Sequence, residues 1–220
     1  MSAKVYFSRD ISPEKVVELY RRLGVELPGK VAVKVHSGEK GNQNFLRPDF
    51  WKPMVDAVRG TVVECNTAYG DAAGGVRDNT ASHLKLIEYH GWNKYFDVDL
   101  MDAEGPDVVW DIPNGKVLKK NTVGKNILNY DSMLVLAHFK GHPMGGYGGA
   151  LKQLAIGCAS ARGKALIHSA GVTNDRFECW DKHASNVLFP EAMADAASSI
   201  YRHFERSEES RVGKDCRSRW

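Results

Sequence analysis

Residues 133–152 read MLVLAHFKGHPMGGYGGALK, and the rest of the chain is best understood from this stretch outward. The apolar run at residues 133–137 has the length and composition of a buried β-strand. His138, Lys140 and His142 follow where that strand would end, and ligands of open α/β sheets bind at the carboxyl ends of strands. The glycines that come next let backbone N–H groups approach a ligand closely. The stretch therefore predicts a ligand site.

Length and composition indicate one globular domain. The chain has 220 residues, is 43% hydrophobic and carries a formal net charge of +3, which predicts a single sizeable core. A charge this small and scattered argues against nucleic acid or an anionic membrane as the main partner. No apolar run is long enough to cross a bilayer and the first residues lack a secretion signal, so we expect a soluble cytoplasmic protein.

The cysteines carry no metal-binding motif. Cys65, Cys158, Cys179 and Cys216 lie far apart and include no Cys-x-x-Cys pair. Neither the usual zinc motif nor the motif for a four-iron cluster can therefore be recognised. Cys158 is more typical of a small core residue than of a nucleophile. The sequence leaves the identity of any metal unknown.

Helix and strand patterns alternate along the chain. They predict strands over residues 4–8, 30–36, 60–66, 96–100, 108–111 and 133–137, and helices over 13–23, 49–59, 79–90, 150–158 and 189–204. Residues 106–125 are predicted to form a small hairpin, residues 160–164 a turn, and the glycine-rich run an open loop. This rhythm predicts an α/β fold with a mostly parallel sheet and helices on both faces.

The predicted strand over residues 30–36 has a polar side. Its valines share one face, whereas Lys34 and His36 share the other. Two interpretations are equally good: the polar face is solvated, or its end belongs to a ligand site. His36 stands at the end of the strand, next to a polar segment that contains Lys40.

Positive charge gathers around the glycine-rich loop. Between residues 130 and 171 there are four lysines and arginines but only one acidic residue. This excess suits a carboxylate or phosphate ligand. The loop matches neither the Walker motif nor the dinucleotide-binding fingerprint, and a structural turn explains its glycines equally well. The glycines in question are Gly145, Gly146, Gly148 and Gly149.

The histidines and Lys152 allow more than one role. His138 and His142 are four residues apart, but the following proline and glycines disfavour a helix, so a metal would need a third ligand such as His36 or His168. Hydrogen bonds to the backbone are the simpler explanation for these histidines. Lys152 suits an anion contact, a general base or a surface position, and only burial would lower its pKa enough for the second role.

Four segments carry a family resemblance. They are residues 33–42 (VKVHSGEKGN), 64–69 (ECNTAY), 138–142 (HFKGH) and 146–152 (GYGGALK). Together they resemble domain-of-unknown-function family 362, the uncharacterised iron–sulfur-centre proteins. The resemblance runs in order through about residues 3–204.

The resemblance also implies what is missing. Family members often continue into a ferredoxin-type segment whose Cys-x-x-Cys runs bind four-iron clusters, so we expect an iron–sulfur cluster in full-length members although its ligands are absent from this chain. Residues 205–220 are similar to a translated artefact that recurs on unrelated proteins. We therefore expect residues 1–204 to be a truncated domain with a sheet incomplete at its C-terminal end, and residues 205–220 to be a non-native or disordered tail.

The leading hypothesis is an enzyme-like, redox-linked domain that binds a small anionic substrate or cofactor. Its catalytic residues would be His138, His142 and Lys152, and the ligand contacts would be Lys34, His36, Lys40, Lys140, Gly145, Gly146, Gly148 and Gly149. One alternative is a non-catalytic electron-transfer or cluster-carrier scaffold that docks a redox partner. Another is a metal-cofactor enzyme, because the loop distantly resembles the His/Gly-Gly/Lys segment of lactate-racemase-like enzymes, which hold a nickel-pincer nucleotide.

Overall fold

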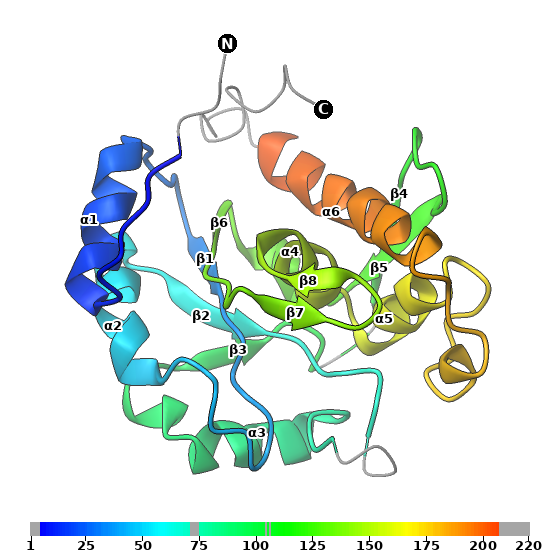
Figure 1. The fold of residues 1–220 in the computed structure, drawn as a ribbon, viewed down its shortest axis with the longest axis horizontal. Coiled ribbons are helices and arrows are strands. Elements are labelled where there is room, and N and C mark those ends of the chain that lie inside the picture. Colours follow the sequence, from blue (N-terminus) through cyan, green and yellow to red (C-terminus); the bar gives the residue numbers. More distant parts are fainter. Residues whose placement is uncertain (1–4, 71–74, 104, 106, 207–220) are drawn as a thin grey trace.

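The computed structural model describes residues 5–70, 75–103, 105 and 107–206 (Figure 1). Its elements, in chain order, are α1 (Pro13–Leu23), β1 (Val31–Lys34), α2 (Pro48–Val58), β2 (Thr61–Glu64), α3 (Thr80–Tyr89), η2 (Trp92–Lys94), β3 (Val98–Leu100), β4 (Val108–Asp111), β5 (Lys120–Val123), η3 (Lys125–Asn129), β6 (Ser132–Val135), β7 (Lys140–His142), β8 (Gly146–Gly148), α4 (Ala150–Cys158), α5 (Ala161–His168), η4 (Glu178–Trp180) and α6 (Leu188–Arg206). None of the helices in these residues has the length and apolar character needed to span a membrane.

A four-stranded parallel sheet in the order β3-β2-β1-β6 forms the centre of the molecule. Val33 of β1 lies opposite Val62 of β2 on one side and Leu134 of β6 on the other. From β1 the chain moves outward to β2 and β3, and then returns to the opposite side of β1 to form β6. The connections therefore diverge at the carboxyl ends of β1 and β6, which is where open sheets of this kind bind ligands.

Helices pack on both faces of this sheet, as predicted. Successive side chains of a strand point to opposite faces. On one face, Val33 belongs to a core that includes Trp51 of α2 and residues of α1 and α3. On the other face, Ala32 packs in a second core with Cys158 of α4 and Ile200 of α6. The α/β prediction is therefore confirmed.

Two antiparallel hairpins extend this framework (Figure 1). The hairpin predicted within residues 106–125 is formed by β4 and β5. The glycine-rich run, predicted to be an open loop, instead contains the hairpin of β7 and β8, in which Lys140 lies opposite Gly148. Gly146 has a φ of 71°, a conformation that side chains rarely adopt, so the tight turn requires glycine there.

Two other local predictions were wrong. Among the described residues, residues 5–8 pair with no strand, and Val5 and Phe7 are 85% and 82% exposed. Their alternating pattern therefore does not form part of a sheet. Lys4, the first residue of the predicted strand, lies outside the described residues. Residues 160–164 do not turn back but begin α5. The Ser160 side chain accepts the N–H of Gly163, which satisfies a donor at the start of that helix.

Ile200→Ala tests whether α6 belongs to the cooperative core. The side chain of Ile200 is fully buried, so its truncation should lower the free energy of unfolding by about 2–4 kcal/mol through lost burial and a cavity. Urea unfolding followed by circular dichroism measures this. Leu84→Ala, at a position 47% exposed on α3, should change the free energy by less than about 1 kcal/mol. Equal effects of the two substitutions would contradict the packing described here.

Candidate functional site

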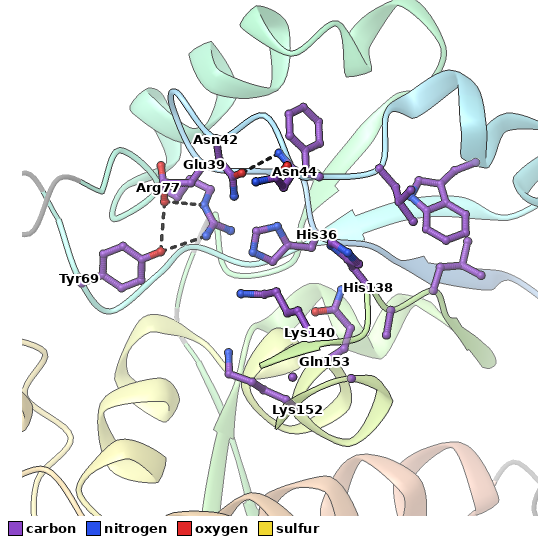
Figure 2. A pocket seen from close by; sticks show the side chains of 17 residues that line it. His36, Glu39, Asn42, Asn44, Tyr69, Arg77, His138, Lys140, Lys152 and Gln153 are labelled. Atoms are coloured by element: carbon purple, nitrogen blue, oxygen red, sulfur yellow. Dashed lines mark hydrogen bonds and ion pairs between the residues drawn. The ribbon is translucent and has the colours of Figure 1, made fainter. Parts of the chain in front are cut away.

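A cavity lies at the carboxyl ends of β1 and β6, and it has two adjoining compartments of about 190 and 420 Å³. The smaller compartment is bounded by the segment after β1 and by the residues that follow β6 (Figure 2). The larger compartment lies between the β7–β8 hairpin, α4 and α5. Both compartments are lined by His36, Tyr69, Arg77, Lys140, Lys152 and Gln153.

An internal network of ion pairs supports the cavity wall. Lys34 Nζ lies 2.7 Å from Glu64 Oε2, and both side chains are buried. Arg77 lies 3.5 Å from Glu64 and 3.1 Å from Glu39, and it also donates a hydrogen bond to the Tyr69 hydroxyl (Figure 2). Burial alone would raise the pKa of Glu64, but the charges of Lys34 and Arg77 outweigh it and hold that pKa well below its usual range. Both carboxylates are therefore neutralised from within the protein.

Backbone N–H groups determine the tautomers of two imidazoles in the cavity. The N–H of Gly38 donates to His36 Nδ1 at 3.0 Å, and the N–H of Gly145 donates to His142 Nδ1 at 3.1 Å. Each Nδ1 is thus an acceptor, and the proton of the neutral ring sits on Nε2. Burial lowers the pKa of both histidines, to about 4 for His142, so the rings are neutral at pH 7. Each ring offers one Nε2–H donor.

His168 has the opposite tautomer. Its Nδ1 lies 2.7 Å from the carbonyl oxygen of Lys164 and donates to it, which leaves Nε2 as an acceptor in the larger compartment. Metal-bound histidines usually donate their second nitrogen in this way. His168 meets that condition, whereas His36 and His142 do not. Among the described residues, no group of three or more His, Cys, Asp or Glu could hold a metal ion.

Lys152 stands on the wall shared by the two compartments, in the first turn of α4. Within the described part of the chain, no carboxylate forms an ion pair with it. Burial, followed by the positive charges of Lys140 and Lys164, lowers its pKa to about 8. Its stem lies beside Gly148, where a Cβ would be 3.7 Å from Lys152 Cδ, an ordinary van der Waals distance.

Gln153 adds a donor that lacks a partner. Its Nε2 atom is buried and makes no hydrogen bond to the described residues, although Gln153 lines both compartments. A buried amide N–H without an acceptor costs free energy.

The structure brings most of the predicted site residues together. His36, Lys140 and Lys152 line both compartments, whereas His138 lines only the smaller one and His142 only the larger one. Among the glycines, Gly148 and Gly149 line the smaller compartment, whereas Gly145 and Gly146 line neither.

Two predicted anion contacts lie elsewhere. Lys40 is exposed and lines neither compartment. Lys34 is directed into its ion pair with Glu64. All four residues of β1 are buried, so the interpretation of this strand as half-exposed, with a solvated polar face, was wrong.

Sequence reasoning missed several lining residues. Arg77 and Tyr69 come from the loop after β2, to which no site residue was assigned, and Trp180 comes from η4. Gln153 follows Lys152 directly, yet nothing in the local pattern distinguishes it from a surface glutamine. An arginine in a glycine-bearing loop after a predicted strand was the one usable signal.

The described cysteines do not fit an iron–sulfur cluster. Cys65, Cys158 and Cys179 are buried free thiols, and Cys216 lies outside the described residues. Cluster ligands are thiolates. Among the described residues, neither these cysteines nor other His, Asp or Glu side chains form a group of three or more that could hold a metal ion.

The structure is that of an α/β protein with a cavity, lined by several cationic side chains, where the connections of its parallel sheet diverge. The chain belongs to the family described as "Domain of unknown function (DUF362)", whose model matches residues 31–218. The resemblance inferred from the four sequence motifs is thereby confirmed. The family description assigns no activity, and no match was found among the curated proteins or the solved structures.

Glu64→Gln tests the internal network. The substitution removes the negative charge with which both Lys34 and Arg77 pair. At pH 7 the free energy of unfolding should therefore fall by about 3–5 kcal/mol. The lowered pKa of Glu64 adds stability above its ordinary value of 4.5, and this stability is lost as the pH falls below that value. The difference in the free energy of unfolding between the wild type and Glu64→Gln should therefore become smaller as the pH falls below 4.5.

Urea unfolding across a pH series measures both effects. Glu88→Gln, at an exposed position of α3, is the matched control and should change the free energy of unfolding by less than about 1 kcal/mol. A constant difference between wild type and Glu64→Gln at every pH would show that the Glu64 carboxylate is not what stabilises the network.

Proposed function

We propose that the protein binds a small anionic molecule, a carboxylate or phosphate compound, in this cavity and acts on it as an enzyme. The observation that carries the proposal is an excess of donors over available negative charge. Lys140, Lys152 and the Nε2–H groups of His36 and His142 line the cavity, while its carboxylates are already paired with Arg77. An anion would supply the missing acceptors.

Electrostatics favour such a ligand. Hydrogen bonds between lysine ammonium groups and carboxylate or phosphate oxygens are short and strong, and partial enclosure strengthens them. Helix α4 starts at the cavity with no side-chain cap at Gly149, so the positive end of its dipole adds to the same field. The larger compartment, at about 420 Å³, also falls within the usual volume range of small-molecule sites.

We assign the proposed catalytic roles by the state of each group. Lys152, with a pKa of about 8, suits proton transfer near neutral pH. The neutral ring of His142 donates from Nε2 to an oxygen that gains charge. His138 is exposed at the edge of the smaller compartment and would contact the outer part of the ligand.

The redox-linked part of the proposal rests on the resemblance to iron–sulfur-centre proteins. Because the described cysteines offer no cluster ligands, any cluster in this proposal would belong to a redox partner or to residues outside those described. The chemistry proposed at the cavity does not depend on it.

Lys152→Gln tests anion binding. Malonate and inorganic phosphate should raise the melting temperature of the wild-type protein above that of a chloride control at equal ionic strength, because a ligand of the native state stabilises it. The substitution removes one charge-assisted contact, so malonate affinity should fall about 10–100-fold. Lys52→Gln, an exposed lysine paired with Asp56 on α2, should keep the wild-type response. The proposal fails if no anion stabilises the wild type, or if Lys152→Gln responds as strongly.

The pH dependence of malonate binding provides a second test. The ammonium form of Lys152 attracts an anion, so affinity should fall as the pH rises through about 8 and the amine loses its proton. Lys152→Arg keeps its charge across this range and should show a flatter profile. Calorimetric titration between about pH 7 and pH 9 measures the profile, and identical profiles for wild type and variant would remove Lys152 from the binding site.

A further inference from the structure

Resting on the proposed anion site, we propose that Lys152 is a nucleophile that forms an imine with the carbonyl carbon of a small 2-oxo acid. The inference deepens the proposed function by naming a substrate class and a covalent step. It stands on the position of the amine in the shared wall of the two compartments and on the groups that surround it.

A lysine can attack a carbonyl only as a free amine. Most buried lysines are held as ammonium ions by a carboxylate, as Lys34 is by Glu64. Lys152 has no such partner among the described residues. Glu39 and Glu64 also line the compartments, but both are paired with Arg77. Burial and the positive charges of Lys140, Lys164, Arg77 and Lys34 lower the pKa of Lys152 to about 8. These surroundings therefore increase the fraction of free amine near neutral pH, which is one of the recognised ways in which proteins activate lysine.

Space around the amine is also available. Gly148 of β8 has no side chain where a Cβ would contact the stems of both Lys140 and Lys152, at 3.6 and 3.7 Å. The stems of Lys140 and Lys152 therefore both lie beside Gly148, next to the cavity that both side chains line. In Figure 2 the Lys152 side chain extends toward the space that Lys140 and His36 also approach.

The remaining groups point to a 2-oxo acid rather than a neutral carbonyl compound. A carboxylate adjacent to the reacting carbon would be bound by Lys140 beside the amine. The Nε2–H groups of His36 and His142 would donate to the carbonyl oxygen and increase the electrophilicity of its carbon. The larger compartment, with Met144 and Trp180 in its lining, would take the rest of the molecule.

The step balances without an oxidant or a reductant. The Nζ lone pair forms the C–N bond, and the π electrons of the carbonyl move to its oxygen, which takes a proton to give a carbinolamine. The nitrogen lone pair then expels the hydroxyl group, which accepts a further proton and leaves as water. The product is a protonated imine, so one amine, one carbonyl compound and one proton yield one iminium ion and one water. The Nε2 acceptor of His168 lines the same compartment and suits the transfer of the amine proton.

Reductive trapping tests the inference directly. The wild-type protein is incubated with pyruvate and sodium cyanoborohydride, which reduces iminium ions faster than free carbonyl groups, and the adduct is located by peptide mass mapping. Lys152 should be labelled at least about tenfold faster than surface lysines, because each unit of pKa gives a tenfold larger fraction of free amine. Lactate has a hydroxyl group in place of the keto group that the amine attacks, so it should give no adduct.

Two variants separate charge from nucleophilicity. Lys152→Arg keeps a cation and should retain stabilisation by malonate while losing the adduct. Lys52 lines neither compartment, so Lys52→Gln should be labelled at Lys152 like the wild type. Because the adduct is mapped on the wild-type protein, the main result does not depend on the folding of any variant.

The outcomes also separate this inference from the proposed function. If malonate stabilises the wild type but labelling is spread evenly over its lysines, the imine inference is wrong and the anion site stands. If neither malonate stabilisation nor preferential labelling is found, both are wrong. Preferential labelling of Lys152 together with malonate protection against it supports both.

Discussion

The buried ion pair between Lys34 and Glu64 is the interaction on which the rest of the site depends. An unpaired ammonium group at the end of the central strand would be strongly unfavourable, so a carboxylate must stand at the end of the neighbouring strand. The parallel register provides it: Lys34 lies opposite Val63, one residue before Glu64. Glu64 then accepts the N–H of Ser37, which holds the segment leaving β1. Helix α4 can cover the pair because Gly157 has no side chain there; a Cβ would lie 3.2 Å from Lys34 Nζ.

The same network determines the electrostatics of the cavity. Glu64 and Glu39 both form ion pairs with Arg77, and Glu64 also forms one with Lys34. The carboxylates of Glu39 and Glu64 that line the cavity are therefore already ion-paired. Most of the other charged and hydrogen-bonding groups in the lining are cations and N–H donors. Lys152 is affected most, because burial and its neighbours disfavour its ammonium form. The pairing that keeps β1 and β2 together thus uses the nearby carboxylates, and among the described residues none is left to form an ion pair with Lys152.

The fold was largely predictable because its signals are local. Branched apolar runs separated by amphipathic helices predicted the parallel sheet, and the helix predicted over residues 13–23 matches α1, which Ser12 and Gly24 cap. The strand order was not predictable, because it depends on which edge of β1 the late strand β6 joins. Local signals also misled where tertiary context decided: residues 5–8 alternate like a strand but meet no sheet, and Ser160 caps a helix although its surroundings suggested a turn.

The site was predictable where one segment supplies it and not where distant segments meet. Residues 138–152 contain Lys140, His142 and Lys152, but Arg77 reaches the cavity only because β2 lies beside β1. The tautomers of His36 and His142 depend on three-dimensional hydrogen bonds, as features of this second class do. Yet both depend on a glycine that follows the histidine within three residues, Gly38 after His36 and Gly145 after His142. Each of these two turns returns a backbone N–H to Nδ1 of the preceding ring and leaves Nε2 as the donor. The spacing alone does not decide it, because His138 is also followed by a glycine within three residues, Gly141, whose N–H makes no such bond in the described structure.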